Sequence, residues 1–142
     1  MAWVSPTGFV DTANVWGTEP FAYDGNLSTY AQEGYASGWG DFLELTIAAL
    51  NCDKVRHNSQ LTSALDAIDI DVYYDGAWQH VYEGAYAHFT WQEKSLGDTY
   101  AVTAARVRYH RVPEESVRAR LYEFEFNEVV VAVGRSFGYI IG

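Results

Sequence analysis

Residues 67–74 of the chain read AIDIDVYY, and this stretch decides the fold class. Its isoleucines and its valine alternate with Asp69, Asp71 and Tyr73. A period of two places apolar side chains on one face of a β-strand and polar side chains on the other. The stretch therefore predicts a half-buried strand, with Asp69 and Asp71 on the solvated face.

The chain on both sides of this stretch repeats a pattern of short strands and turns. Asp75-Gly76 is a tight hairpin signal, so residues 78–82 are expected to return as the partner strand. Residues 83–98 read as a loop, and residues 59–67 have weak helical character. Further strands are predicted at 42–48, 54–57, 100–112 and 121–130. Short strands separated by turn signals are typical of a β-sandwich or barrel.

Length and composition favour one all-β domain. A length of 142 residues is within the usual range, so residues 1–142 are expected to form a single domain. Hydrophobic residues make up 49% of the chain, which is enough to bury a core. Aromatic residues make up 16%, and they favour strands over helices.

The net charge of −10 indicates which partners the chain avoids. An acidic protein repels nucleic-acid backbones and anionic lipids, so neither is an expected partner. No apolar run approaches ~18 residues, so no insertion into a membrane is expected. Five of the nine basic residues nevertheless lie between Arg106 and Arg120. Either these arginines pair with nearby acids on a strand face, or they form a basic stripe for an acidic partner.

The candidate nucleophiles and bases lack the arrangement of a catalytic site. Cys52, the single cysteine, lies near His57 in sequence, but catalysis also needs an orienting group and an oxyanion site. The four histidines lack paired spacing for zinc. We expect Cys52 to be a small buried residue that forms no intrachain disulfide, and we expect the protein not to be an enzyme.

The first residues, MAWVSP, lack the basic region and the apolar core of a signal peptide. We therefore expect synthesis in a cytoplasm. From there the protein either stays cytoplasmic or becomes part of a virus particle.

Residues 22–31 read AYDGNLSTYA and gather several oxygen donors within a few positions. A carboxylate, a carboxamide and a hydroxyl lie beside a glycine that permits tight curvature. Calcium binds six to eight such oxygens, so the segment is a candidate cation cage. Asp-Gly-Asn is equally an ordinary turn, and both interpretations remain open.

The order of several segments resembles the discoidin-like domains, also called coagulation factor five/eight type C domains. Residues 22–31 are followed by Trp39 and by FLEL at 42–45, as in the family pattern "A-x-D-G-N-x-x-T … W … L-E-L". Three later segments are similar to strands of that family: DVYYDGAW at 71–78, ARVRYHRV at 105–112 and LYEFEF at 121–126. The resemblance covers roughly residues 15–129. It implies a two-sheet antiparallel jelly-roll β-sandwich of the galactose-binding-like type.

The resemblance also implies a structural calcium ion between the Asp-Gly loop and the closing strand. The residues that match the family's positions are Asp24, Asn26, Thr29 and Glu123. One ion would tie the start of the chain to its end. Asn26 departs from the family, where Asp is frequent, and the lost charge lowers the expected affinity. The alternative is a cage closed by hydrogen bonds alone.

In this family, ligands are usually held by loops at one end of the sandwich. Trp91 with His88 and Glu93 is the predicted sugar site, because sugars stack their C–H faces on aromatic rings and need polar neighbours. Other loop aromatics complete the predicted set: Trp16, Tyr35 and Tyr86. Trp39 and Trp78 are instead expected in the core, because the family matches place them beside buried strands.

The segment 129–142 is strongly apolar. It is predicted to be either an inner strand or an arm that packs on a neighbouring subunit, since an exposed apolar β-edge would aggregate. The residues expected to contact a neighbour are Val129, Val131, Val133, Phe137, Tyr139 and Ile140. A homo-oligomer is the expected state.

Two functions follow from these observations. Short proteins of the "D-G-N-x-x-T-Y-A … W … F-L-E-L" pattern are similar to bacteriophage virion proteins, which implies a capsid decoration, tail or fibre component. The alternative is a carbohydrate-binding module that recognises surface glycans through its loop aromatics. Both are binding or assembly roles without catalysis.

Overall fold

The computed structural model describes residues 2–34, 38–112 and 117–130. In these residues the chain forms β-strands and one short 3-10 helix, and none of its helical segments is long and apolar enough to span a membrane. The elements are β1 (Ala2–Val4), β2 (Gly8–Val10), β3 (Trp16–Gly17), η1 (Glu19–Tyr23), β4 (Ala31–Glu33), β5 (Gly38–Trp39), β6 (Leu43–Ser59), β7 (Leu65–Tyr74), β8 (Ala77–Gly84), β9 (Gln92–Arg111) and β10 (Arg120–Glu128). The predicted all-β fold is confirmed.

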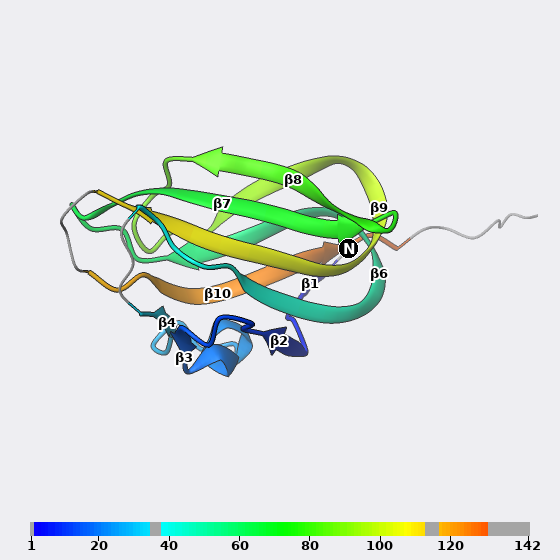
Figure 1. Cartoon of the computed structure of the whole chain (residues 1–142). Helices are drawn as coiled ribbons and strands as arrows, with labels where there is room; N and C mark the ends of the chain where they lie inside the picture. Colours follow the sequence, from blue (N-terminus) through cyan, green and yellow to red (C-terminus); the bar gives the residue numbers. More distant parts are fainter. Residues whose placement is uncertain (1, 35–37, 113–116, 131–142) are drawn as a thin grey trace, which may run out of the picture.

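The strands form two antiparallel layers that share the long strands β6 and β9 (Figure 1). One layer contains β2, β5, the first half of β6, the second half of β9, β7 and β8, and we call it the β7 layer. The other contains β1, β3, β4, β10, the second half of β6 and the first half of β9, and we call it the β10 layer. Shifts in the β6–β9 register lie at Thr46/Leu50 and Cys52/Lys54. Such irregularities bend strands, which lets both cross from one layer to the other.

The core lies between the two layers. Strand β7 contributes Ile68, Ile70 and Val72, all fully buried, as the period-two pattern predicts. Strand β10 contributes Phe124 and Phe126, whose rings meet edge to face with centroids 5.4 Å apart. Aromatic and branched side chains therefore fill the space between the sheets.

Three predicted boundaries are wrong. The predicted strand at 54–57 is the second half of the continuous strand β6, and the predicted loop at 83–98 is shorter because β9 begins at Gln92. Residues 59–67 contain no helix, since β6 runs to Ser59 and β7 begins at Leu65. Pairing with distant strands extends these segments beyond what local propensity indicates.

The predicted solvated face of β7 is also wrong. Asp69 and Asp71 are only 3% and 7% exposed. Arg108 Nε donates to Asp69 and Arg106 Nε donates to Asp71, each over 2.9 Å. The arginines of β9 therefore cover the aspartates, and the interpretation that arginines pair with nearby acids is confirmed for this pair of strands.

Trp39 and Trp78 lie at the outer surface of the β7 layer rather than in the core. Both side chains are half-buried. The Arg108 guanidinium lies 5.0 Å from the Trp39 ring centroid, and the Arg106 guanidinium lies 4.4 Å from that of Trp78. Cation–π contacts of this kind hold a ring on a surface without burying it.

The two ends of the described chain meet in the β10 layer. Strand β1 pairs with β10, and Ala2 is the cross-strand partner of Glu128. The Val129 N–H donates to Asn51 O over 2.8 Å, and the Val130 side chain is 75% exposed. The other predicted assembly residues lie outside the described residues: Val131, Val133, Phe137, Tyr139 and Ile140.

Candidate functional site

The outer face of the β7 layer contains a hollow of about 300 Å³. Strands β6 to β9 each contribute to its lining, which consists of Glu44, Thr46, Tyr73, Trp78, Thr103 and Ala104. We call this set the Trp78 groove. Ala104 is the cross-strand partner of both Thr46 and Tyr73. Its single methyl group between larger neighbours leaves the space that forms the hollow.

Two aromatic rings form one wall of the Trp78 groove. Tyr73 and Trp78 are cross-strand partners, with ring centroids 5.3 Å apart and planes at 80°. The Arg106 guanidinium lies 4.4 Å from the Trp78 ring and 4.2 Å from the Phe42 ring, and Asp71 anchors it. An ion pair on one side and two rings on the other therefore hold the wall in place.

The Trp78 groove is bordered by a second hollow of about 290 Å³. Glu44 lines both hollows, and Arg106 and Phe42 line the second one. The hollowed surface therefore continues across the layer from β8 toward β2.

Polar groups of the Trp78 groove are free to meet a ligand. Within the described part of the chain, no side-chain hydrogen bond or ion pair involves Glu44, Thr103, the Tyr73 hydroxyl, the Trp78 indole N–H or the Thr46 hydroxyl. A ligand site usually combines aromatic surface with a few polar groups that orient the ligand. The Trp78 groove has both in one hollow.

A comparable hollow of about 320 Å³ lies beside β4 and η1, but three of its polar side chains already have partners. Thr29 donates to Asp24, and Thr18 donates to Tyr30 O. Gln32 accepts from Arg120. This hollow is therefore less suited to a polar ligand than the Trp78 groove.

The structure gives each residue of the predicted loop site a separate partner. The Arg56 guanidinium lies 4.0 Å from the Trp91 ring centroid and 4.2 Å from that of Trp3. Glu93 pairs with Lys54 over 2.8 Å. His88 Nδ1 accepts the Leu61 N–H over 3.1 Å. The loop site remains a prediction, and its polar groups are already engaged.

Trp16 and Tyr86, predicted to contact a sugar, are buried core residues. Their ring centroids lie 6.2 and 5.6 Å from that of Tyr109. Trp16 Nε1 donates to Asp41 O, and the Tyr86 hydroxyl donates to Gln60 O. We correct the prediction for these two rings, since neither presents a face to solvent. Tyr35, the third loop aromatic, lies outside the described residues.

The residues of the predicted calcium site do come together. Asp24 accepts the Thr29 hydroxyl over 2.5 Å and the Asn26 N–H over 2.9 Å. Glu123 Oε2 accepts the Gly25 N–H over 3.0 Å, although the two residues are 98 positions apart. The left-handed φ of +75° at Gly25 favours glycine there. The loop is thus held against strand β10.

Glu123 is the buried carboxyl group of this set, and it lies beside the Asp24 carboxylate. It is 1% exposed, and its Oε1 has no hydrogen-bond partner among the described residues. Burial, followed by the neighbouring Asp24 carboxylate, raises the pKa of Glu123 to about 8. A hard cation would satisfy the orphaned oxygen and neutralise the carboxylate pair, so the donor set fits calcium.

Cys52 and His57 do not form a nucleophile–base pair. Cys52 is fully buried, as predicted, and burial raises the pKa of its thiol to about 11. His57 Nδ1 lies 2.8 Å from Ser59 Oγ, and burial lowers the pKa of His57 to about 3. A protonated, buried thiol and a neutral, buried imidazole act as structural rather than reactive groups.

The architecture is the galactose-binding-like jelly-roll β-sandwich, and solved structures of that fold resemble this chain. One is a CBM32 domain of AlyQ in complex with 4,5-unsaturated mannuronic acid, at 15% identity and a TM-score of 0.65, covering 91% of this chain and 100% of that one. Another is CBM32-1 from a family 31 glycoside hydrolase of Clostridium perfringens, at 13% identity and a TM-score of 0.67, covering 87% and 96%. A third is the family 32 CBM from C. perfringens NanJ in complex with galactose, at 12% identity and a TM-score of 0.60, covering 88% and 90%.

These structural neighbours are carbohydrate-binding modules, and at such low identity the likeness establishes the fold alone. No family model matches the sequence. No curated protein matches it either.

Proposed function

We propose that this chain is a non-catalytic carbohydrate-binding module and that the Trp78 groove holds the sugar. The observation that carries the proposal is the coincidence of an aromatic wall with unengaged polar groups in one hollow. At about 300 Å³ the hollow is at the small end of ligand sites, which suits one or two sugar units.

In the proposed complex, the apolar C–H face of the sugar packs against the Trp78 and Tyr73 rings. Its hydroxyls then hydrogen-bond to the Glu44 carboxylate and to the threonine hydroxyls. Because these groups have no internal partner in the described chain, binding breaks no protein hydrogen bond. Sugar binding would therefore add protein–sugar hydrogen bonds without removing any hydrogen bond within the described protein.

The fold supports this function as an analogy. Two of the neighbouring modules have 4,5-unsaturated mannuronic acid and galactose in their complexes. Fold alone does not determine function, so the proposal for this chain rests on the residues that line the Trp78 groove.

A glycan array tests the proposal, with the labelled full-length chain and two matched tryptophan variants. We expect saturable binding to at least one glycan, loss of that binding in Trp78→Ala, and retention in Trp91→Ala. An array without hits would contradict the function. Binding lost in Trp91→Ala but retained in Trp78→Ala would support the predicted loop site and contradict the groove.

We also propose a structural calcium ion that is held by Asp24, Asn26, Thr29 and Glu123. The ion would contribute positive charge beside the buried Glu123 carboxyl and the exposed Asp24 carboxylate, and would link the Asp24 loop to β10. Support comes from the unpartnered Glu123 oxygen. The ion has no role in holding the sugar, since the Trp78 groove lies on the other layer.

A second candidate function is assembly into a virus particle as a virion structural protein. The exposed apolar Val130 beside the apolar segment 131–142 favours contacts with a second copy or with another virion protein. Both functions are compatible, because a surface module on a particle can bind glycans.

A further inference from the structure

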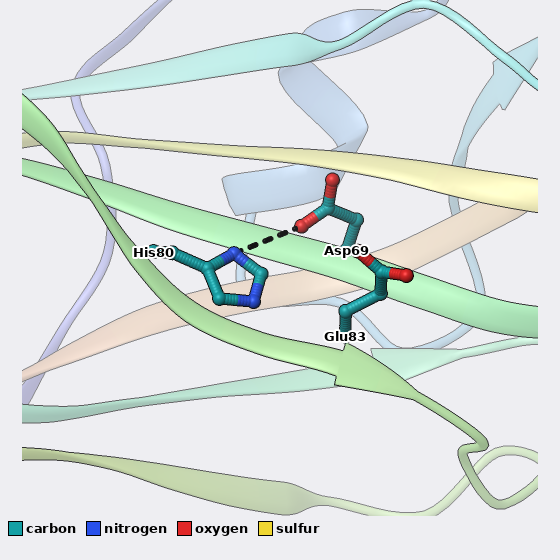
Figure 2. Close-up of side chains that lie close together, drawn as sticks. All are labelled: Asp69, His80 and Glu83. Atoms are coloured by element: carbon teal, nitrogen blue, oxygen red, sulfur yellow. Dashed lines mark ion pairs between the residues drawn. The ribbon is translucent and has the colours of Figure 1, made fainter.

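Asp69, His80 and Glu83 place three metal-ligating side chains together on the outer face of β7 and β8 (Figure 2). One ligand atom of each lies within 4.8 Å of the other two. Asp69 and Glu83 are cross-strand partners. The cluster is separate from the predicted calcium residues, which lie around β10.

A β-bulge creates this cluster. Residues three apart on a regular strand, such as His80 and Glu83, point to opposite faces. The pairing of β7 with β8 shifts between Ile70 and Asp71, so Asp71 opposes His80 and Val81 is the extra residue. The bulge therefore brings His80 to the same face as Glu83.

Asp69 is a buried carboxylate with one unsatisfied oxygen. Oδ2 accepts from Arg108, while Oδ1 has no hydrogen-bond partner among the described residues. Oδ1 lies 3.4 Å from His80 Nδ1, and the residue is 97% buried. His80 is an ion-pair partner of this oxygen only when the imidazole is protonated, so beside a neutral imidazole the buried Oδ1 would lack a partner, which is unfavourable.

We propose that Asp69, His80 and Glu83 bind a divalent transition-metal ion such as Zn²⁺. One imidazole nitrogen and two carboxylate oxygens suit a borderline ion, whereas calcium prefers oxygen ligands alone. Three protein ligands leave a fourth position for water. Asp71 Oδ1 lies 3.1 Å from His80 Nδ1, and a carboxylate partner on that nitrogen orients an imidazole that ligates through Nε2.

The charges around the cluster permit a cation. Asp69, Asp71 and Glu83 supply three negative charges, and Arg106 and Arg108 offset two of them. His80 remains accessible, with 58% of its side chain exposed, so an ion can reach the site from solvent. A bound dication would provide Asp69 Oδ1 with a charged partner.

Calorimetric titration of the chelator-treated, full-length chain with ZnCl₂ tests the proposal. We expect saturable binding of one ion per chain, with an affinity at least about tenfold lower in His80→Asn and in Glu83→Gln. His110→Asn is the matched control, because His110 pairs with Asp66 outside the cluster, and it should bind as wild type. A Co²⁺ titration should give the visible absorption of a low-coordinate site in wild type and lose it in His80→Asn.

Absence of saturable zinc binding would overturn the proposal. So would a His80→Asn variant that binds zinc as tightly as wild type. Thermal melts without metal verify that His80→Asn remains folded, as expected for an exposed side chain. A CaCl₂ titration of His80→Asn should match wild type, which separates this cluster from the predicted calcium site.

Discussion

Glu123 is the single residue whose ionisation most affects stability near neutral pH. Its pKa of about 8 in the folded protein exceeds its ordinary value of 4.5, so the folded state holds the proton more tightly than the unfolded state. Stability from this residue is therefore fully present below about pH 4.5, is lost progressively as pH rises from there to about 8, and levels off above 8. We predict a falling melting temperature between pH 7 and 8.5 in EDTA, with a slope of at most about 1.4 kcal/mol per pH unit.

Glu123→Gln is the matched variant for this measurement, and its melting temperature should fall less steeply with pH in the same range. Folded His57 is neutral throughout this window, because burial lowers its pKa to about 3. Glu33, whose pKa burial raises to about 7, titrates in the lower part of the window in both proteins, so the difference between wild type and variant isolates Glu123. Calcium at about 100 times its dissociation constant should stabilise wild type by roughly 2.7 kcal/mol and abolish the slope. An identical melting temperature with calcium and with chelator would contradict the proposed calcium ion.

Gly40 is a second residue with a specific structural requirement. A Cβ atom there would lie 1.9 Å from Glu33 Oε2. Glu33 is fully buried, accepts the Asp41 N–H and pairs with Arg111 over 3.2 Å. Gly40→Ala should therefore lower the free energy of unfolding by roughly 3 kcal/mol, measured by urea denaturation, because it disrupts a buried ion pair.

Gly17→Ala is the control for this substitution, since a Cβ there meets only Gln32 O at 3.9 Å. Its free energy of unfolding should change by less than about 1 kcal/mol. Equal effects of the two substitutions would contradict the structural role of Gly40.

At the scale of the strands, the sequence predicted local pattern well and long-range contacts poorly. The period of two identified β7 and its buried residues. The burial of Asp69 and Asp71 depends on arginines 35 and 39 positions away, which no local pattern contains. The same limitation explains why β6 was predicted as two short strands: its continuity depends on pairing with β9 and β10.

The aromatic wall of the Trp78 groove could have been found from the sequence. A two-residue Asp75-Gly76 turn makes Tyr73 and Trp78 cross-strand partners, and the alternation puts Tyr73 on the polar face. Trp78 must then share that face, so its predicted core position conflicts with the hairpin. Glu44 and Thr103 could not be found in this way, because they come from strands whose register depends on the whole sheet.

The stack of Trp3, Arg56 and Trp91 joins β1, β6 and the start of β9. Because Trp91 contacts a guanidinium already bound to Glu125, its removal should affect stability rather than sugar binding. We predict that Trp91→Ala lowers the free energy of unfolding by about 1–2 kcal/mol, measured by urea denaturation. An unchanged free energy of unfolding would show that the ring adds nothing to the stack.

At the scale of the whole molecule, the ends of the described chain lie together and the Trp78 groove lies on the face of the other layer. Ala2 and Glu128 are partners in the β10 layer, while the groove is lined by residues of β6 to β9. Contacts made through the chain ends would therefore leave the groove accessible. A tethered or assembled module needs this arrangement if it is also to bind a glycan.

Assembly of the full-length chain remains a prediction. If segment 129–142 contacts a neighbouring subunit, sedimentation velocity should show a species larger than the 16.0 kDa monomer. A charge at the predicted contact, as in Val133→Glu, should shift the population toward monomer. A wild-type chain that stays monomeric at all accessible concentrations and never associates with particles would contradict the predicted assembly role.

The central claim, that the Trp78 groove binds a sugar, is tested most directly by nuclear magnetic resonance of the five tryptophan indole N–H groups. Galactose, chitosan oligosaccharides and mannuronate oligosaccharides are titrated separately, and Trp78→Phe assigns the signal. We predict that the Trp78 signal shifts saturably with at least one of these sugars. The Trp16 signal should stay fixed, because the Trp16 indole N–H donates to Asp41 O. A Trp78 signal that stays fixed while that of Trp39 or Trp91 moves would contradict it, as would the absence of any shift.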